Sequence, residues 1–485
     1  MVFSSPIFLF LFLPIVLAGC LLPSLRLRNL WLLAFSILFY AWGEVGFVGL
    51  MLASTLINYF LGRWVEMETD ERHRRWAVGV AIALNLGLLG FFKYTNFAVH
   101  NLNALLGMVG AKPVMVRDVR LPIGISFFTF HAISYVMDIY RRKWVSAKNP
   151  TDVALYIFFF PQLIAGPILR WNAIAPQIAS RRQTTDRFAQ GIRRFAEGLA
   201  KKVIIANAVA VPADAIFGFS ANWHDLTMAT AWVGAICYML QIYFDFSGYS
   251  DMAIGLGMMF GFEFMENFNY PYVAQSIRDF WRRWHISLSS WFRDYLYIPL
   301  GGNRCSEKRN KFNLVIVFLL CGLWHGASWT FVLWGLYHGA FIVLEHGPAG
   351  RSLERIPRPL RHFYALVVVL VGWVLFRAPS FWVAVGYLCN MAGIHLGNVT
   401  AQSLAGLINH QSTYALIAGL VLATPVWTWV KTWSAGKLEK WPGAWGNAAQ
   451  GASAGAQLAV VLALLIVSAA WLAGGTYNPF IYFRF

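Results

Sequence analysis

The feature that most constrains this chain is a series of apolar runs that begins near residue 5 and recurs to residue 475. A run of roughly 20 apolar residues crosses the hydrocarbon core of a bilayer as a helix. Strands are excluded because an open sheet edge in lipid would leave backbone groups without hydrogen bonds. Only 13% of the residues are charged, against about 25% in soluble domains. These features predict an all-α polytopic membrane protein.

We predict one membrane domain over residues 1–485, because no long polar region separates the apolar runs. The domain would contain about 12 membrane-crossing or re-entrant helices, together with interfacial helices. The predicted spans are 5–22, 29–43, 46–62, 76–92, 121–140, 226–244, 248–262, 313–326, 327–345, 363–377, 411–430 and 456–475. The prolines in "LYIFFFPQLIAGPIL", residues 155–169, predict a further re-entrant or broken segment.

The net charge of +17 is distributed unevenly among the predicted loops. Most of the 39 Lys and Arg residues fall in alternate loops, and Lys93 is among the few assigned to the opposite set. This bias is the positive-inside pattern, so it predicts basic loops at the cytoplasmic face and both termini outside. The pattern indicates a multi-pass membrane protein in contact with lipid and requires no nucleic-acid partner.

Two basic segments have the amphipathic pattern of interfacial helices, at about 186–209 and 276–298. In the first, Phe188, Phe195 and Leu199 recur at helical spacing while the basic residues fall elsewhere. In the second, His285 lies on the same predicted face as the tryptophans and is therefore directed into protein or bilayer. Either a structural hydrogen bond or a functional role would explain a histidine there.

The sequence "GLWHGASWTFVLWGLYHG", residues 322–339, contains two similar five-residue phrases, each with one histidine. The surrounding apolar region, 312–344, would be roughly 50 Å long as one straight helix, so it must break, tilt strongly or fold back. Its paired glycines allow a neighbouring backbone to approach closely. Because burying an ionisable group in a membrane is costly, His325 and His338 are functional candidates, with helix packing as the alternative.

Other polar residues interrupt the apolar segments. Asp245 and Asp251 are six residues apart, with Gly248 predicted to mark a turn, and structural hydrogen bonding is favoured over catalysis for both. His131 lies two helical turns from Asp138, which predicts an interior polar contact. Neither an HExxH motif nor paired Cys and His spacing occurs, so we predict no metal site.

Three long motifs resemble the membrane-bound O-acyltransferase family. They are "YFDFSGYSDMAIGLGMMFGF", "SIRDFWRRWHISLSSWFRDYLYIPLGGNR" and "LWHGASWTFVLWGLYHG". The similarity runs nearly end to end. It is greatest to the bacterial branch of the family, whose members acetylate alginate or transfer D-alanine to teichoic acid. Within that branch, the motifs resemble the alginate type more than the D-alanine type. The resemblance implies a helical ring thinned at its centre, with funnels from both faces meeting near a histidine. That histidine matches His325, and a second functional position matches His285.

The resemblance also implies a reaction, in which acetyl moves from a cytoplasmic thioester toward O-acetylation of alginate or a related exopolysaccharide. His325 would act as a general base on an acceptor hydroxyl or, alternatively, carry the acetyl group as a nucleophile. His285 would orient the substrate or polarise the thioester carbonyl. The donor, acetyl-CoA or another acetyl thioester, would be a substrate, and no bound cofactor is expected.

Four more residues are candidate substrate contacts: Arg282, Arg283, Asp245 and Trp324. The two arginines could attract the phosphates of the donor, although contact with lipid headgroups would explain them equally. The family analogy implies periplasmic acetyltransferase partners of the alginate system and allows a cytoplasmic carrier of the acyl donor. Transfer of D-alanine or another acyl group is the alternative within the enzyme class. A membrane transporter is the alternative from a different class.

Overall fold

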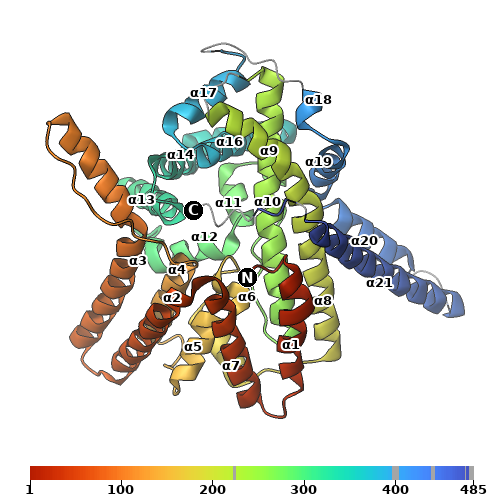
Figure 1. Cartoon of the computed structure of the whole chain (residues 1–485), viewed down its shortest axis with the longest axis horizontal. Helices are drawn as coiled ribbons and strands as arrows, with labels where there is room; N and C mark the ends of the chain where they lie inside the picture. Colours follow the sequence, from red (N-terminus) through yellow and green to blue (C-terminus); the bar gives the residue numbers. More distant parts are fainter. Residues whose placement is uncertain (222–225, 396–403, 439–442, 476, 480–485) are drawn as a thin grey trace.

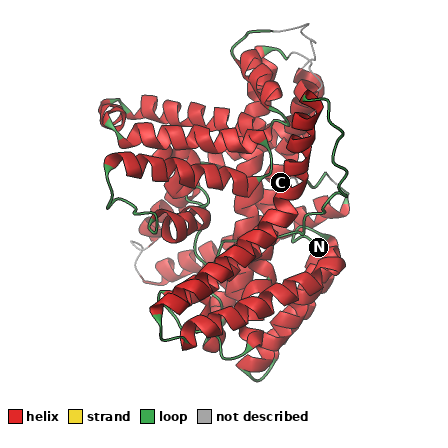
Figure 2. Ribbon diagram, turned by 90° about the vertical axis from the view of Figure 1, so that its left-hand side faces the viewer, coloured by secondary structure: helices red, strands yellow, loops and turns green. Residues whose placement is uncertain are grey.

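The computed structural model describes residues 1–221, 226–395, 404–438, 443–475 and 477–479, and helices are the regular elements throughout that part of the chain (Figures 1 and 2). Five helical segments are long and apolar enough to cross a membrane. These are Leu25–Met67, Glu71–Met108, Thr185–Ala221, Arg358–Arg377 and Gly451–Ala473. The prediction of an all-α membrane protein is therefore confirmed.

The two longest helices contain three of the predicted spans. Helix α2, Leu25–Met67, contains the spans predicted at 29–43 and 46–62, and it kinks between them at Glu44, whose backbone is non-helical. The Glu44 carboxylate pairs with Arg120 at 3.2 Å, so a charged residue lies at the kink that separates the two predicted spans. Helix α3, Glu71–Met108, continues past the predicted end at residue 92. Lys93 therefore lies within α3, and its assignment to an outward loop was wrong.

A second pair of long helices packs antiparallel through glycines. Helices α8 (Thr185–Ala200), η3 (Lys201–Ala206) and α9 (Asn207–Ala221) are continuous and lie against α10, Met228–Met259. Gly198 and Gly248 face each other so closely that a methyl group on Gly198 would lie 2.5 Å from the Gly248 carbonyl oxygen. Since α10 is unbroken, the predicted turn at Gly248 and the separate spans 226–244 and 248–262 were wrong.

The two predicted interfacial helices differ from their predicted bounds. The segment 186–209 begins a longer helical run whose apolar face packs on α10 instead of ending as an isolated surface helix. The segment 276–298 is three short helices, α11 (Ile277–Arg283), α12 (Ile286–Phe292) and η5 (Arg293–Tyr297). It divides because His285 adopts a left-handed backbone conformation, with φ 44° and ψ 53°. The position of both segments at a membrane surface stays a prediction.

The doubled glycine and histidine sequence forms a helical hairpin, as its length predicted. Helix α13, Glu307–His325, ends at the first histidine, and α14, Trp329–His346, returns beside it. Gly322 and Gly335 meet where the two helices touch, and a methyl group on Gly335 would lie 3.3 Å from the Gly322 Cα atom. The close approach that the glycine pattern predicted is thus confirmed for these two positions.

The remaining helices surround this central region. In Figure 1 the short α11 and α12 occupy the middle of the molecule, with longer helices around them. This agrees with the predicted helical ring with a thinned centre. The other helices are η1 (Phe8–Phe12), α1 (Leu13–Ala18), η2 (Gly19–Leu21), α4 (Ile125–Tyr140), α5 (Pro150–Phe158), α6 (Phe160–Leu163), α7 (Trp171–Ala179), η4 (Pro271–Val273), α15 (Pro348–Arg355), α16 (Arg358–Arg377), α17 (Phe381–Met391), α18 (Leu404–Leu407), α19 (His410–Leu422), α20 (Val426–Leu438) and α21 (Gly443–Ala473). The break between α5 and α6 at Phe159 confirms the broken segment predicted at 155–169.

Candidate active site

His325 is the last residue of α13, and the chain turns away from the helix immediately after it. Gly326 has extended backbone, with φ −166° and ψ 156°. The imidazole is surrounded by aromatic rings, with centroids 4.9 Å from Trp324, 5.1 Å from Trp334 and 5.2 Å from Phe376. His325 keeps 8% of its surface accessible, whereas His285 keeps none. His325 is therefore nearly enclosed but not sealed.

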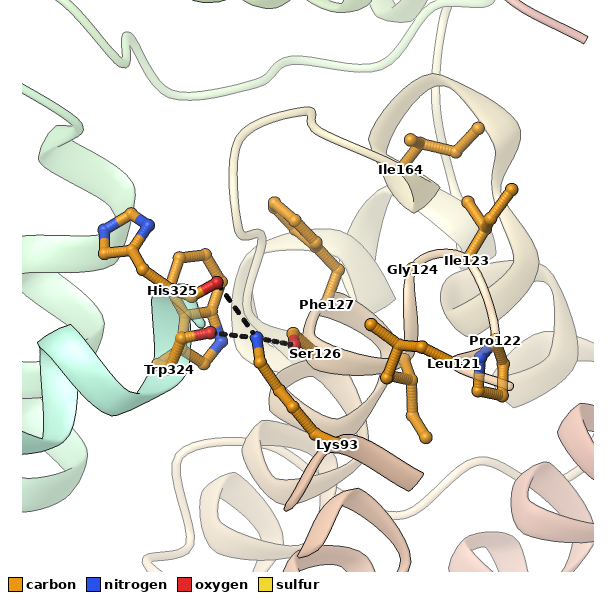
Figure 3. A pocket seen from close by; sticks show the side chains of 11 residues that line it. Lys93, Leu121, Pro122, Ile123, Gly124, Ser126, Phe127, Ile164, Trp324 and His325 are labelled. Atoms are coloured by element: carbon orange, nitrogen blue, oxygen red, sulfur yellow. Dashed lines mark hydrogen bonds between the residues drawn. The ribbon is translucent and has the colours of Figure 1, made fainter. Parts of the chain in front are cut away.

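A cavity of about 250 Å³ lies beside the end of α13. Its wall is formed mainly by the segment that leads into α4 and by residues of α3 and α13. The lining residues are Lys93, Leu121, Pro122, Ile123, Gly124, Ile125, Ser126, Phe127, Ile164, Trp324 and His325. Figure 3 shows that the backbone carbonyl of His325 faces Lys93, while the imidazole projects away from it.

His285 lies between α11 and α12 and is held by Asn267. The Asn267 side-chain oxygen accepts a hydrogen bond from the Ser287 backbone N–H at 3.2 Å, which identifies this atom as the oxygen of the amide. The same oxygen lies 3.1 Å from His285 Nδ1, so in neutral His285 the Nδ1 atom carries the proton and donates. The buried Nε2 atom is then an acceptor, and it has no hydrogen-bond partner among the described residues.

Trp324 connects the two predicted catalytic histidines. Its ring centroid lies 4.9 Å from that of His325 and 6.1 Å from that of His285. Phe246 of α10 packs edge-on against His285 at 4.6 Å. Residues predicted from separate motifs therefore meet in one aromatic cluster. The assignment of catalytic roles to His325 and His285 stays a prediction.

The other predicted substrate contacts have different surroundings. Arg282 is exposed, whereas Arg283 donates to Asp279 at 2.8 Å and to the Asn269 carbonyl at 3.3 Å. Asp245 forms a buried ion pair with Lys202 at 2.7 Å, which confirms the structural bonding favoured for this residue. For all three residues, a substrate contact stays a prediction.

The remaining histidine candidates, His338 and His131, are buried. His338 is 1% exposed and packs against Trp281 and Trp334, with its Nδ1 atom unpartnered among the described residues. Both ring nitrogens of His131 are likewise unpartnered there. The predicted polar contact of His131 was wrong, because Asp138 accepts hydrogen bonds from the Tyr295 hydroxyl and the Asn172 N–H instead.

Sequence reasoning missed two residues of this region, Asn267 and Lys93. Asn267 lies in "EFMENFNYPY", where nothing local indicates that its amide meets a histidine 18 residues away. Lys93 offered a signal, since it is the basic residue in the apolar sequence "LNLGLLGFFKYTNF". An ionisable residue inside such a stretch indicates a buried partner. The prediction placed Lys93 in a loop outside the membrane, so no buried partner was inferred for it.

The fold is that of a membrane protein with a buried histidine cluster, and comparison with known proteins identifies its class. The model of MBOAT, the membrane-bound O-acyltransferase family, matches residues 118–384. The chain belongs to this family and is a multi-pass membrane acyltransferase. The family assignment therefore contradicts the alternative prediction of a membrane transporter.

Individual relatives narrow the class. The chain is 43% identical to an Azotobacter vinelandii protein described as "Probable alginate O-acetylase AlgI", over 100% of both chains. It is 37% identical to the Peptidoglycan O-acetyltransferase of Helicobacter pylori, over 81% of this chain and 80% of the relative. It is 31% identical to the Teichoic acid D-alanyltransferase of Bacillus subtilis, over 44% of this chain and 55% of the relative. The two relatives named for O-acetyl transfer are thus more similar to this chain, and over more of its length, than the D-alanyltransferase is.

Proposed function

We propose that this chain transfers acetyl from a cytoplasmic thioester, with acetyl-CoA as donor, to an acceptor across the bacterial inner membrane. The transfer would serve O-acetylation of alginate or a related exopolysaccharide. End-to-end similarity to a relative named for alginate O-acetylation supports this substrate class. The single observation that carries the chemistry is the pair of enclosed histidines that both contact the Trp324 ring.

In the proposed reaction His325 acts as the general base. Its neutral imidazole takes the proton of the acceptor hydroxyl while the acceptor oxygen bonds to the thioester carbonyl carbon. The carbon–sulfur bond then breaks, and the imidazolium returns the proton to the departing thiolate. The products are an acetyl ester and a free thiol, so atoms and charge balance. His325 lines the cavity beside the end of α13, which supports this role because the base must be reachable by substrate.

His285 orients the acceptor in this proposal. With its Nδ1 proton donated to Asn267, neutral His285 presents Nε2 as a hydrogen-bond acceptor. That polarity suits contact with a hydroxyl group on the substrate. Polarising the thioester carbonyl would require a donor at Nε2, and therefore a protonated imidazole, so the orienting role is the better supported of the two predicted roles.

The remaining parts of the proposal concern access and partners. Exposed Arg282 is suited to attract the phosphates of the donor, and Trp324 to pack against the acyl group. We place the basic loops in the cytoplasm and both termini in the periplasm, with funnels from the two faces meeting at His325. Periplasmic acetyltransferase proteins would receive the acetyl group, and a cytoplasmic carrier is a further possible source of the donor.

Complementation and reconstitution together test the proposal. The chain is expressed in an alginate-producing bacterium that lacks its own relative, and ester-linked acetyl is measured on the secreted alginate. Purified protein in proteoliposomes is supplied with acetyl-labelled acetyl-CoA, and release of the CoA thiol is followed. His325→Ala is expected to abolish both signals. His338→Gln, which alters a histidine of similar burial in the same hairpin, is the matched control and is expected to retain them.

Full acetylation by His325→Ala would refute the histidine mechanism. Labelled D-alanyl thioester supplied beside labelled acetyl-CoA tests the alternative substrate, and preferential release of D-alanine would refute acetyl transfer. Label that remains on the protein after rapid quenching, and is lost in His325→Ala, would favour the nucleophilic role over the general-base role.

A further inference from the structure

The end of α13 is the part of the site that sequence and family leave unexplained. A helix leaves its last four carbonyl groups without intrahelical partners, and for α13 these belong to Gly322, Leu323, Trp324 and His325. Inside a membrane protein such groups must find protein donors, because the hydrocarbon offers none. The carbonyl of Gly322 accepts from the Gly326 N–H at 3.3 Å. The other three need donors from elsewhere.

Two consecutive residues of α3 supply those donors. The Tyr94 hydroxyl donates to the Leu323 carbonyl at 2.6 Å. Lys93 Nζ donates to the Trp324 carbonyl and, at 3.3 Å, to the His325 carbonyl. All four terminal carbonyls of α13 are therefore satisfied. Figure 3 shows Lys93 reaching the two carbonyls from the cavity side.

The ammonium group of Lys93 is fully used by these contacts. A lysine has three N–H donors, and its third acceptor is the Ser126 hydroxyl at 3.3 Å. Lys93 is buried, and each of its donors is directed to protein. It lines the cavity without a donor left for a ligand, and its hydrogen bonds to the site go to the backbone of Trp324 and His325.

We propose that Lys93 and Tyr94 are positioning residues for the catalytic histidine: they fix the end of α13 and so set where the His325 imidazole stands. The inference rests on the proposed function, in which His325 is the base. It also explains why a membrane helix carries a buried cation. A displacement of about 1 Å at a catalytic group can lower a rate about 100-fold.

The test compares matched variants in proteoliposomes supplied with acetyl-CoA as donor, and follows release of the CoA thiol. Lys93→Met keeps the length of the side chain but removes its donors, Lys93→Arg keeps charge and donors, and Tyr94→Phe removes one hydroxyl. Tyr387→Phe is the control, since it also removes one buried hydroxyl that donates to a backbone carbonyl, that of Ala231 at 2.8 Å. Rates are divided by the amount of monodisperse protein, so a loss of folded enzyme alone leaves kcat unchanged.

We expect Lys93→Met to lower kcat about 10- to 100-fold with the KM for acetyl-CoA changed less than twofold. Tyr94→Phe is expected to lower kcat about threefold to tenfold, Lys93→Arg to recover part of the loss, and Tyr387→Phe to stay within twofold of wild type. Unchanged kcat in both Lys93→Met and Tyr94→Phe would overturn the inference, as would a loss in Tyr387→Phe equal to that in Tyr94→Phe. If Lys93→Met does not fold, Tyr94→Phe alone decides. Full activity in His325→Ala would instead refute the proposed function.

Discussion

Replacing Gly335 with alanine tests whether the hairpin of α13 and α14 sets the active-site geometry. The methyl group of Gly335→Ala would meet the Phe318 carbonyl oxygen about 1 Å inside the 3.4 Å at which ordinary contact begins. That oxygen belongs to the backbone of α13 and cannot rotate aside. The two helices must therefore separate by a similar distance where they now touch.

The size of the effect follows from this separation. Overpacking of a close-packed interface costs about 1–3 kcal/mol, which a protein of this size can tolerate while remaining folded. Gly322 lies where the two helices touch, and His325 lies one helical turn beyond it. The ring centroid of His325 is 5.1 Å from that of Trp334 on α14. Moving α13 relative to α14 therefore moves the base relative to the rest of the site. We expect kcat to fall about 10- to 100-fold.

A graded series of glycines provides the assay with its own controls. At Gly339, also on α14, a methyl group would come no closer than 3.2 Å, and only to the Phe318 Cβ atom. At Gly386, on α17, nothing lies within 4 Å. Acetyl transfer in proteoliposomes should fall most in Gly335→Ala, slightly in Gly339→Ala, and not at all in Gly386→Ala. Equal activity of Gly335→Ala and Gly386→Ala would refute the reasoning.

Three further predictions follow from polar contacts of the described residues. Asn267→Ala removes the acceptor that fixes the His285 ring and should lower the transfer rate about tenfold. The same oxygen also accepts from the Ser287 N–H and hydroxyl, so the free energy of unfolding should fall by about 1–3 kcal/mol. Lys202→Met breaks the buried ion pair with Asp245 and should cost about 3–5 kcal/mol, measured by thermal unfolding in detergent, with much of the loss recovered when Asp245→Leu is added. Burial raises the pKa of Asp294, but hydrogen bonding from Arg293 and attraction to Arg170 outweigh this and hold the pKa below its ordinary value. The resulting stability is present above the unfolded pKa of about 3.9 and is lost as pH falls through the folded pKa. The Asp294→Asn variant should therefore be less stable than wild type at neutral pH and should lose less stability on acidification. Acid-unfolding curves of wild type and variant that run parallel would contradict this.

Hydropathy predicted the helical class of this chain and the return of the chain near residue 326, because both depend on length and composition alone. It failed where charged residues lie inside a helix. The predicted boundary inside α10 fell at Asp245 and Gly248, and Asp251 lay inside the second predicted span. In the structure these carboxylates pair with Lys202 and Lys201 on the neighbouring helix. A local hydropathy minimum therefore reflected a satisfied ion pair within a helix instead of the end of one.

The residues of the candidate site also fall into some that the sequence predicted and some that it did not. Motifs within single segments identified His285 and His325, and the resemblance to a family indicated that they belong together. The groups that orient them come from distant segments: Asn267 is 18 residues from His285, and Lys93 is 232 residues from His325. Nothing in the local pattern around a polar residue specifies which distant atom it will meet.

This difference has a physical origin in the cost of burying polar groups. A single sequence shows that a lysine or aspartate in an apolar run is costly, and the simplest inference is that it lies outside the membrane. The structure offers the other solution, in which a partner from another helix offsets the cost. For Lys93 the partners are backbone carbonyls at the end of α13, which have no sequence signature at all. An ionisable residue within an apolar run therefore indicates either the end of a helix or a buried partner, and Lys93, which lies within α3, is an example of the second.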